Sequence, residues 1–148
     1  GDIVEVSSFG ANAFSDDIKA EGDYDSAFTN LRAADGTLIS VLNSRRAVYG
    51  YDQRVEAFGS KGMLQGNNLT PTAVESFGSD HSNKREPFLE FFLERYADSY
   101  RAELRAFIES VKTGKQLNPS YEDGCKALIL ADAATESAKT GKTVTIKN

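Results

Sequence analysis

The length, composition and charge of the chain already exclude several classes of protein. A chain of 148 residues, 40% hydrophobic and 26% charged, suits one globular domain that buries about two-thirds of its unfolded surface. Its net charge of −5 disfavours nucleic acid as a partner, because such a partner requires a concentrated basic surface. The apolar runs, such as residues 127–131, fall far short of the ~20 residues that cross a bilayer, so no membrane partner is expected.

The first part of the chain has the patterns of strands. Val4 and Val6 alternate with Glu5 in an opening strand, and a polar loop follows. Residues 24–33 and 36–45 flank the turn signal Ala34-Asp35-Gly36, which predicts an antiparallel hairpin. Its second arm is apolar on both faces, with Leu38 and Leu42 on one and Ile39 and Val41 on the other. We therefore expect helices to cover one face of the sheet and a partner subunit or domain to cover the other.

The stretch "AVYGYDQRVEAFGSKG", residues 47–62, predicts the next strand. Alternation from Tyr51 to Ala57 places Asp52, Arg54 and Glu56 on one charged, solvated face. Gly50 fits a bulge or a close backbone approach that turns Tyr51 toward a cleft. A turn then leads to short strands over 63–65 and 72–78.

The last part of the chain predicts two helices and a strand. Apolar residues from Leu93 to Val111 follow helical spacing, and Gly114 falls where a left-handed residue would end that helix. Ser120 and Asp123 form a capping-box pattern for a second helix, which runs to about residue 138 and is closed by Gly141, and a strand follows over 143–146. The fold class is α+β, a mostly antiparallel open sheet of about six strands with helices packed on one face.

Few side chains are available for catalysis or for disulfides. Cys125, the sole cysteine, excludes an intrachain disulfide, favours a cytoplasmic protein and is expected to be a buried small residue. His81 lies in the polar stretch "GSDHSNKREP" and is expected to be an exposed loop residue. The acidic stretch from Asp16 to Asp25 matches no EF-hand, so a solvated loop is favoured over a calcium site.

The sequence also lacks the motifs of common catalytic sites. It contains no G-x-G-x-x-G, no G-x-x-x-x-G-K-[ST] and no cluster of metal-ligating residues at the usual spacing. A Ser-His-Asp triad would have to use His81, and no nucleophile-elbow motif presents the serine. The chain by itself therefore has no evident chemistry, and we expect neither a catalytic residue nor a metal site in it.

Three longer segments carry a family resemblance. The segments "NSRRAVYGYDQRVEAFGSKGMLQ", "FFLERYADSYRAELRAFIESVKTGK" and "EDGCKALILADAATESAKTGKTVTI", with the preceding hairpin, resemble the C-terminal half of bacterial inositol 2-dehydrogenases. These enzymes belong to the glucose-fructose oxidoreductase, inositol dehydrogenase and rhizopine-catabolism family. The most specific parts are Y-G-Y-D, followed by an alternating strand and G-x-x-G, and the later R-Y-x-x-x-Y-x-x-E-L. The resemblance covers essentially all of residues 1–148.

The resemblance implies a two-domain, NAD-dependent enzyme that oxidises a polyol such as myo-inositol to 2-keto-inositol. An N-terminal Rossmann domain would hold NAD, and the C-terminal domain would complete the polyol site and form the interface of a homo-oligomer, a dimer or tetramer. The Glu-Lys-Pro and Asp-x-x-x-His motifs that assist catalysis in this family do not occur here. Because the chain also begins at Gly1 without Met, we expect a C-terminal substrate-binding and oligomerisation domain that is inactive alone, with no cofactor-binding residues of its own.

Two tyrosines are the candidate substrate-binding residues. By the resemblance, Tyr51 and Tyr100 match tyrosines that reach the polyol, whereas Tyr49 and Tyr96 are expected to be structural. A phenol offers one donor and one acceptor on a rigid apolar ring, which suits recognition of hydroxyl groups. Spacing alone favours ordinary strand and helix-core tyrosines.

Two alternatives stay open from the sequence. The chain could be a stand-alone, non-catalytic module that binds a polyol or sugar or assembles with full-length partners. It could also be an unrelated α+β fold of similar layout, because layered folds recur without shared function. A coding sequence for a G-x-G-x-x-G domain upstream and in frame would decide for the dehydrogenase domain.

Overall fold

The computed structural model describes residues 1–147, which divide into two compact units. The first comprises Gly1–Arg46 and the segment from Gln116 onward, and the second comprises Ala47–Lys115. Each contains strands and helices, and every strand pairing is antiparallel. The predicted α+β class with antiparallel sheets is confirmed.

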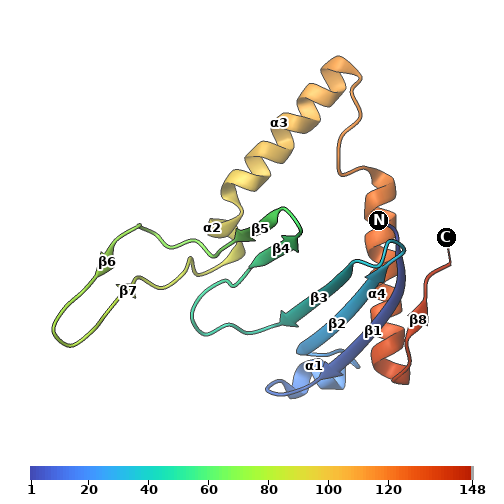
Figure 1. Cartoon of the computed structure of the whole chain (residues 1–148), viewed down its shortest axis with the longest axis horizontal. Helices are drawn as coiled ribbons and strands as arrows, with labels where there is room; N and C mark the ends of the chain where they lie inside the picture. The colour runs from blue at the N-terminus through green and yellow to red at the C-terminus, as the bar shows by residue number, and fades with distance from the viewer. Residues whose placement is uncertain (148) are drawn as a thin grey trace. The chain divides into compact units, whose positions relative to one another are not determined.

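The first unit is a four-stranded sheet with the strand order β3-β2-β1-β8 (Figure 1). Its strands are β1 (Ile3–Ala11), β2 (Ser26–Ala33), β3 (Leu38–Ser44) and β8 (Val144–Thr145). The predicted hairpin is confirmed, with β2 and β3 in register from Ser26 opposite Ser44 to Arg32 opposite Leu38. Gly36 has a φ of 89° in the turn, a conformation that glycine adopts without steric cost.

Helix α4 (Tyr121–Thr140) covers one face of this sheet. The capping box between Ser120 and Asp123 begins the helix, and Gly141 ends it with a φ of 67°, both as predicted. The core lies between α4 and β1, where Val6, Ala33 and Ala133 are buried. The buried Ser137 accepts a hydrogen bond at 2.9 Å from the backbone N–H of Ser8. Small side chains on α4 therefore allow the helix to contact the strand backbone directly.

Cys125 is exposed on α4, so the expectation of a buried cysteine is wrong. The face of α4 that contacts the sheet holds Ala133 and Ser137. At 3.6 residues per turn, Cys125 lies about 100° around the helix from these two residues. Its side chain therefore points away from the core.

The opposite face of the sheet is an open apolar surface within the described residues. Phe9 lies opposite Phe28, and Phe28 lies opposite Leu42 on the next strand. These side chains are 67%, 41% and 74% exposed, and Leu38 on the same face is 78% exposed. We call this surface the open face, and define it by Phe9, Phe28, Leu38 and Leu42. The predicted two-sided apolarity of β3 is present, and the chain itself covers one of the two sides.

The acidic stretch between β1 and β2 differs from the predicted solvated loop. It contains the short helix α1 (Asp16–Ala20), whose N-cap is Ser15. Asp25 is 1% exposed and accepts hydrogen bonds from the backbone N–H groups of Ala13, Phe14 and Ser15 at 2.9–3.0 Å. Burial alone would raise the pKa of Asp25, but these hydrogen bonds together hold it below its usual value. Asp25 is therefore a structural anchor of the loop.

The second unit consists of two hairpins and two helices. The strands β4 (Val55–Gly59) and β5 (Gly62–Gly66) form one hairpin, and β6 (Glu75–Ser76) and β7 (Lys84–Arg85) form the other. Residues 1–147 thus contain eight strands in three sheets, where an open sheet of about six strands was predicted. An additional strand is β7, which lies in a stretch expected to be a loop. The strands also pair in three separate sheets, whereas a single open sheet was expected.

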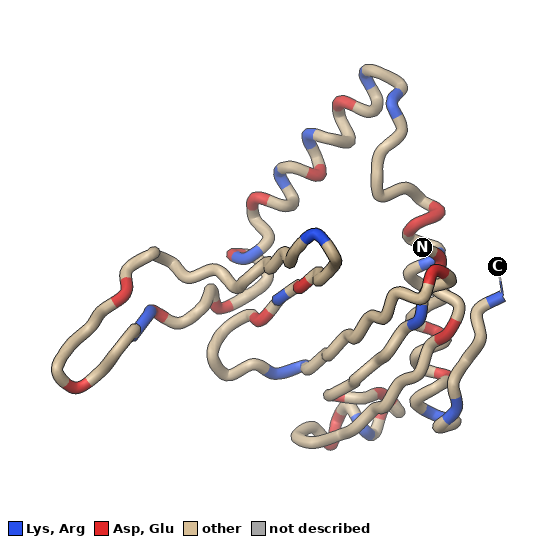
Figure 2. Tube along the Cα trace, viewed as in Figure 1, with Lys and Arg blue, Asp and Glu red and all other residues tan. Residues whose placement is uncertain are grey.

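The predicted long helix is present as two pieces. They are α2 (Phe92–Arg95) and α3 (Ala97–Thr113), with Tyr96 between them, and Gly114 ends α3 with a φ of 69° as predicted. Acidic and basic residues alternate along α3 (Figure 2). Its apolar stripe is not buried by the described chain: Leu104, Phe107 and Val111 are 54–71% exposed. No helix in residues 1–147 is long and apolar enough to span a membrane.

Candidate functional site

The second unit contains a loop, residues 47–54, that positions the candidate tyrosines. Gly50 has a φ of 115°, and a Cβ on it would lie 2.8 Å from the carbonyl oxygen of Phe88. The next backbone N–H, that of Tyr51, donates to the carbonyl of Leu89 at 2.8 Å. The close backbone approach predicted at Gly50 is therefore present.

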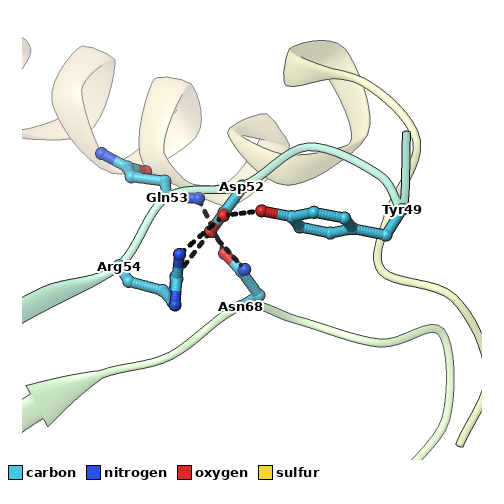
Figure 3. Close-up of polar contacts among 5 residues, drawn as sticks. All are labelled: Tyr49, Asp52, Gln53, Arg54 and Asn68. Carbon is cyan, nitrogen blue, oxygen red and sulfur yellow. Dashed lines mark hydrogen bonds and ion pairs between the residues drawn. The ribbon is translucent and has the colours of Figure 1, made fainter. Parts of the chain in front are cut away.

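Asp52 is the centre of a polar cluster in this loop (Figure 3). Its carboxylate accepts hydrogen bonds from the hydroxyl of Tyr49, from Nδ2 of Asn68 at 2.6 Å, and from two nitrogens of Arg54 at 2.9 Å each. Asn68 also accepts from the backbone N–H of Gln53 at 2.7 Å. The sequence pattern had placed Asp52 on a solvated strand face, which is wrong: β4 begins only at Val55, and the Asp52 side chain is 15% exposed.

These contacts change the acidity of both partners. Hydrogen bonds from Tyr49 and Asn68, and then the interaction with Arg54, lower the pKa of Asp52 from 3.8 to about 2, although its burial acts in the opposite direction. The hydrogen bond to Asp52 raises the pKa of the Tyr49 hydroxyl. Tyr49 therefore acts as a neutral donor that fixes the loop, which agrees with its expected structural role.

The low pKa of Asp52 predicts a loss of stability in acid. The decrease in the pKa of Asp52 from 3.8 to about 2 stabilises the folded state by about 2 kcal/mol. This holds at any pH at which the carboxylate is ionised in both the folded and the unfolded state. This contribution is complete above about pH 5 and disappears as the pH falls through about 4 to 2. Urea unfolding at a series of pH values should show this loss in the wild type and a smaller one in Asp52→Asn.

A matched control for this prediction is Asp98→Asn. Asp98 is in the same unit and pairs with Arg101, but its side chain is 98% exposed. Its replacement should leave the acid dependence of the free energy of unfolding nearly unchanged, because exposed pairs contribute little. Equal acid sensitivity in the wild type and Asp52→Asn would contradict the assignment.

Three tyrosines form a row beside this cluster. The ring centroids of Tyr51 and Tyr96 are 5.6 Å apart and those of Tyr96 and Tyr100 are 6.3 Å apart, with the rings edge to face in both pairs. We call Tyr51, Tyr96 and Tyr100 the tyrosine row. Edge-to-face packing holds each ring in a defined orientation. The structure thus brings Tyr51 and Tyr100 into one local arrangement, with Tyr96 between them.

The hydroxyl groups of the row differ in their partners. Tyr96 donates to Oε1 of Gln53 at 2.6 Å, and burial, followed by the influence of the neighbouring Tyr51 phenol, raises the pKa of Tyr96. Tyr100 is 52% exposed, and its hydroxyl makes no hydrogen bond to another residue among the described 1–147. The Tyr96 hydroxyl thus already has a partner within the protein, whereas the Tyr100 hydroxyl is available to a ligand. Sequence reasoning did not identify Gln53, and a lone glutamine in an alternating segment offers no signal for such a role.

The described residues lack the usual arrangement for a dinucleotide and a cluster of metal ligands. A dinucleotide pyrophosphate binds at a helix N-terminus next to parallel strands, whereas all strands here are antiparallel. The long helices α3 and α4 also have acidic residues in their first turns, which repel phosphate. Within residues 1–147 no group of three or more His, Cys, Asp or Glu side chains could hold a metal ion.

The antiparallel fold and the tyrosine row define the class of the protein: an α+β domain with antiparallel sheets and three adjacent tyrosines. A family model described as "Oxidoreductase family, C-terminal alpha/beta domain" matches residues 3–146. The chain belongs to this family.

Known relatives agree with this assignment. The chain is 42% identical to a myo-inositol 2-dehydrogenase from Thermotoga maritima, covering 99% of the chain and 43% of the relative. It superimposes on a crystal structure of a myo-inositol dehydrogenase from Corynebacterium glutamicum with a TM-score of 0.94 and 48% identity, covering 99% of the chain and 44% of that structure. The chain also superimposes on a myo-inositol dehydrogenase from Lactobacillus casei, solved with NAD(H) and myo-inositol. The TM-score is 0.77 at 28% identity, covering 99% of the chain and 42% of that structure. The chain therefore spans less than half the length of these relatives.

Proposed function

We propose that this chain is the C-terminal, substrate-side domain of a bacterial, cytoplasmic, NAD-dependent inositol 2-dehydrogenase. The intact enzyme would oxidise myo-inositol to 2-keto-inositol. The observation that supports this most strongly is the tyrosine row, in which the Tyr96 ring contacts both the Tyr51 ring and the ring of the half-exposed Tyr100. The relatives from Thermotoga maritima and Corynebacterium glutamicum have the same activity in their names.

The chemistry of the row suits a polyol. A cyclic polyol has hydroxyl groups around an apolar ring, and each hydroxyl both donates and accepts hydrogen bonds. Phenol groups provide the same two functions on flat apolar surfaces, so Tyr51 and Tyr100 can bind hydroxyl groups while their rings contact C–H edges. The hydrogen bonds from Tyr49 to Asp52 and from Tyr96 to Gln53 keep the loop and the row in place before a ligand arrives.

NAD and the catalytic base belong to a domain outside residues 1–147 in this proposal. The antiparallel sheets and the acidic helix starts do not suit a dinucleotide, and the L. casei relative that was solved with NAD(H) is more than twice as long as the chain's match to it. The apolar stripe on α3 is exposed, which supports a further domain that covers this stripe in the intact enzyme. The chain alone therefore should bind polyol weakly and should not transfer hydride.

A binding and turnover experiment on the chain itself tests the proposal. In a ¹⁵N-labelled sample, myo-inositol should shift the amide signals of residues around Tyr51 and Tyr100, whereas NAD should cause no saturable shift. A mixture of the chain, NAD and myo-inositol should produce no reduced cofactor. Binding of NAD, turnover, or inositol shifts confined to the first unit would each contradict the proposal.

We further propose that the open face joins copies of this domain into a dimer or tetramer. Phe9, Phe28, Leu38 and Leu42 form a continuous apolar area on neighbouring strands. The area also includes an ion pair between Glu5 and Arg32 and a hydrogen bond between Ser40 and Asn30 at 2.7 Å. A flat apolar centre with paired polar groups is typical of a face that packs against another sheet.

Charge at the centre of the open face should prevent this assembly. Leu42→Lys should shift the protein to monomers in sedimentation or light-scattering measurements, with at least about a tenfold weaker association, because an unpaired ammonium group would be buried. Leu128→Lys is the matched control, since Leu128 is 63% exposed on α4. A wild-type protein that stays monomeric at high concentration would refute the proposal.

A further inference from the structure

A second cluster of polar side chains lies in the hairpin of β6 and β7, and it shares no residue with the tyrosine row. Nδ1 of His81 is 2.7 Å from Oδ1 of Asp80, and Nε2 of the same ring is 3.0 Å from Oγ of Ser76. The three side chains thus form a continuous carboxylate–imidazole–hydroxyl chain. His81 was expected to be a solvated loop residue, but its side chain is only 33% exposed.

The hairpin holds this arrangement in several ways. Glu75 and Arg85 form an ion pair across the paired strands, and the backbone N–H of Gly78 donates to the carbonyl of His81 at 3.0 Å. A Cβ at Gly78 would lie 2.7 Å from Cε1 of His81, so glycine leaves the space that the imidazole occupies. The two strands are drawn side by side in Figure 1. The imidazole is therefore positioned by the backbone as well as by its side-chain partners.

The direction of the hydrogen bonds follows from the groups involved. A carboxylate accepts only, so Nδ1 of His81 bears the hydrogen that Asp80 binds, and Nε2 is left with a free electron pair toward Ser76. An imidazole in this state accepts the proton of a serine hydroxyl and makes the oxygen a better nucleophile. The order of carboxylate, imidazole and hydroxyl is the order that activates a serine.

We propose that Ser76 is an acyl-acceptor site, with His81 as its general base and Asp80 as the residue that orients the imidazole. The substrate class is an activated acyl donor, such as an aryl ester. In the reaction, a bond forms between Oγ of Ser76 and the acyl carbon, and the bond from that carbon to the leaving oxygen breaks. The hydroxyl proton passes to Nε2 of His81 and then to the leaving oxygen, so no oxidant or reductant is needed.

The exposure of the cluster sets its expected rate. The side chain of Asp80 is 84% exposed, so water screens its effect on the imidazole. General-base catalysis by a positioned side chain gives about 10²–10⁴-fold in enclosed sites, and we expect about tenfold to a hundredfold here. The acyl group should stay on Ser76 long enough to be detected, because an exposed site that is screened by solvent activates water only weakly for its removal. The reaction is then a single acylation and does not depend on the inositol site.

Acetylation by p-nitrophenyl acetate tests this inference on the whole chain. Peptide mapping by mass spectrometry should find Ser76 acetylated at least about tenfold faster than Ser79 and Ser82, two exposed serines of the same hairpin that serve as internal controls. His81→Gln should slow acetylation of Ser76 by about tenfold or more, and Asp80→Asn should slow it less.

Other outcomes would overturn the inference. Acetylation of Ser76 at the rate of Ser79 and Ser82, or no change in His81→Gln, would mean that the three side chains only close the hairpin. Acetyl groups found on lysines alone would mean the same. Circular dichroism of each variant should match the wild type, since the substituted side chains lie at the end of an exposed two-stranded hairpin.

Discussion

Replacing Gly50 by alanine is expected to lower the free energy of unfolding by about 3 kcal/mol, as measured by urea denaturation. A φ of 115° is unfavourable for any residue with a Cβ. The new methyl group would also lie 2.8 Å from the carbonyl oxygen of Phe88 and 3.1 Å from that of Leu89. Backbone atoms cannot rotate away, so relief requires the loop to move and to break the bond from Tyr51 to Leu89.

Gly59→Ala is the matched control for this variant. Gly59 lies in β4 of the same unit, and its added Cβ would meet no atom within 4 Å. Its replacement should change the free energy of unfolding by less than about 1 kcal/mol. A Gly50→Ala variant as stable as Gly59→Ala would show that the loop has a different conformation in solution, and the geometry proposed for Tyr51 would then be wrong.

Local patterns explain why much of the fold could be predicted from the sequence. Alternation and the Asp35-Gly36 turn indicated the hairpin of β2 and β3, and a capping box and two glycines indicated the ends of the long helices. Each of these signals depends on residues within a few positions of one another. The structure therefore reproduces these elements closely.

The polar anchors could not be predicted in this way. Asp25 and Asp52 both appeared as members of charged, solvated stretches, yet one binds three backbone N–H groups and the other binds Tyr49, Arg54 and Asn68. Their partners are set by how the loops fold, and composition does not reveal which acid of a cluster turns inward. The same holds for β7, whose pairing with β6 brings Ser76 close to His81.

The candidate site was predicted in part. The spacing of Tyr96 and Tyr100 places them one turn apart on a helix, so their contact follows from the sequence. Tyr51 joins them through a contact with Tyr96 that spans 45 positions, and only the family resemblance suggested that Tyr51 and Tyr100 belong to one site. Their role in binding a polyol stays a prediction.

Removal of single hydroxyl groups tests that role. Tyr51→Phe and Tyr100→Phe keep the rings that pack in the row, so they isolate the hydrogen bond from the apolar contact. If these hydroxyls bind the polyol, each loss should weaken binding by roughly 1–3 kcal/mol, which is about 5- to 150-fold, because a buried ligand hydroxyl is left without a partner. In an enzyme that joins this domain to its cofactor domain, the effect should fall mainly on KM, with a smaller decrease in kcat.

Tyr49→Phe is the control among neighbouring tyrosines. Its hydroxyl donates to Asp52, so its loss should raise the pKa of that carboxylate toward its usual value and lower stability at neutral pH, with a smaller further loss in acid, while the affinity for the polyol changes little. Tyr96→Phe should act mainly on stability, since its hydroxyl donates to Gln53. The affinity for NAD should stay constant in all four variants, because the proposed function places the NAD site in the other domain. Small and equal changes in KM at all four positions would show that these tyrosines serve the fold and that polyol recognition lies in the other domain.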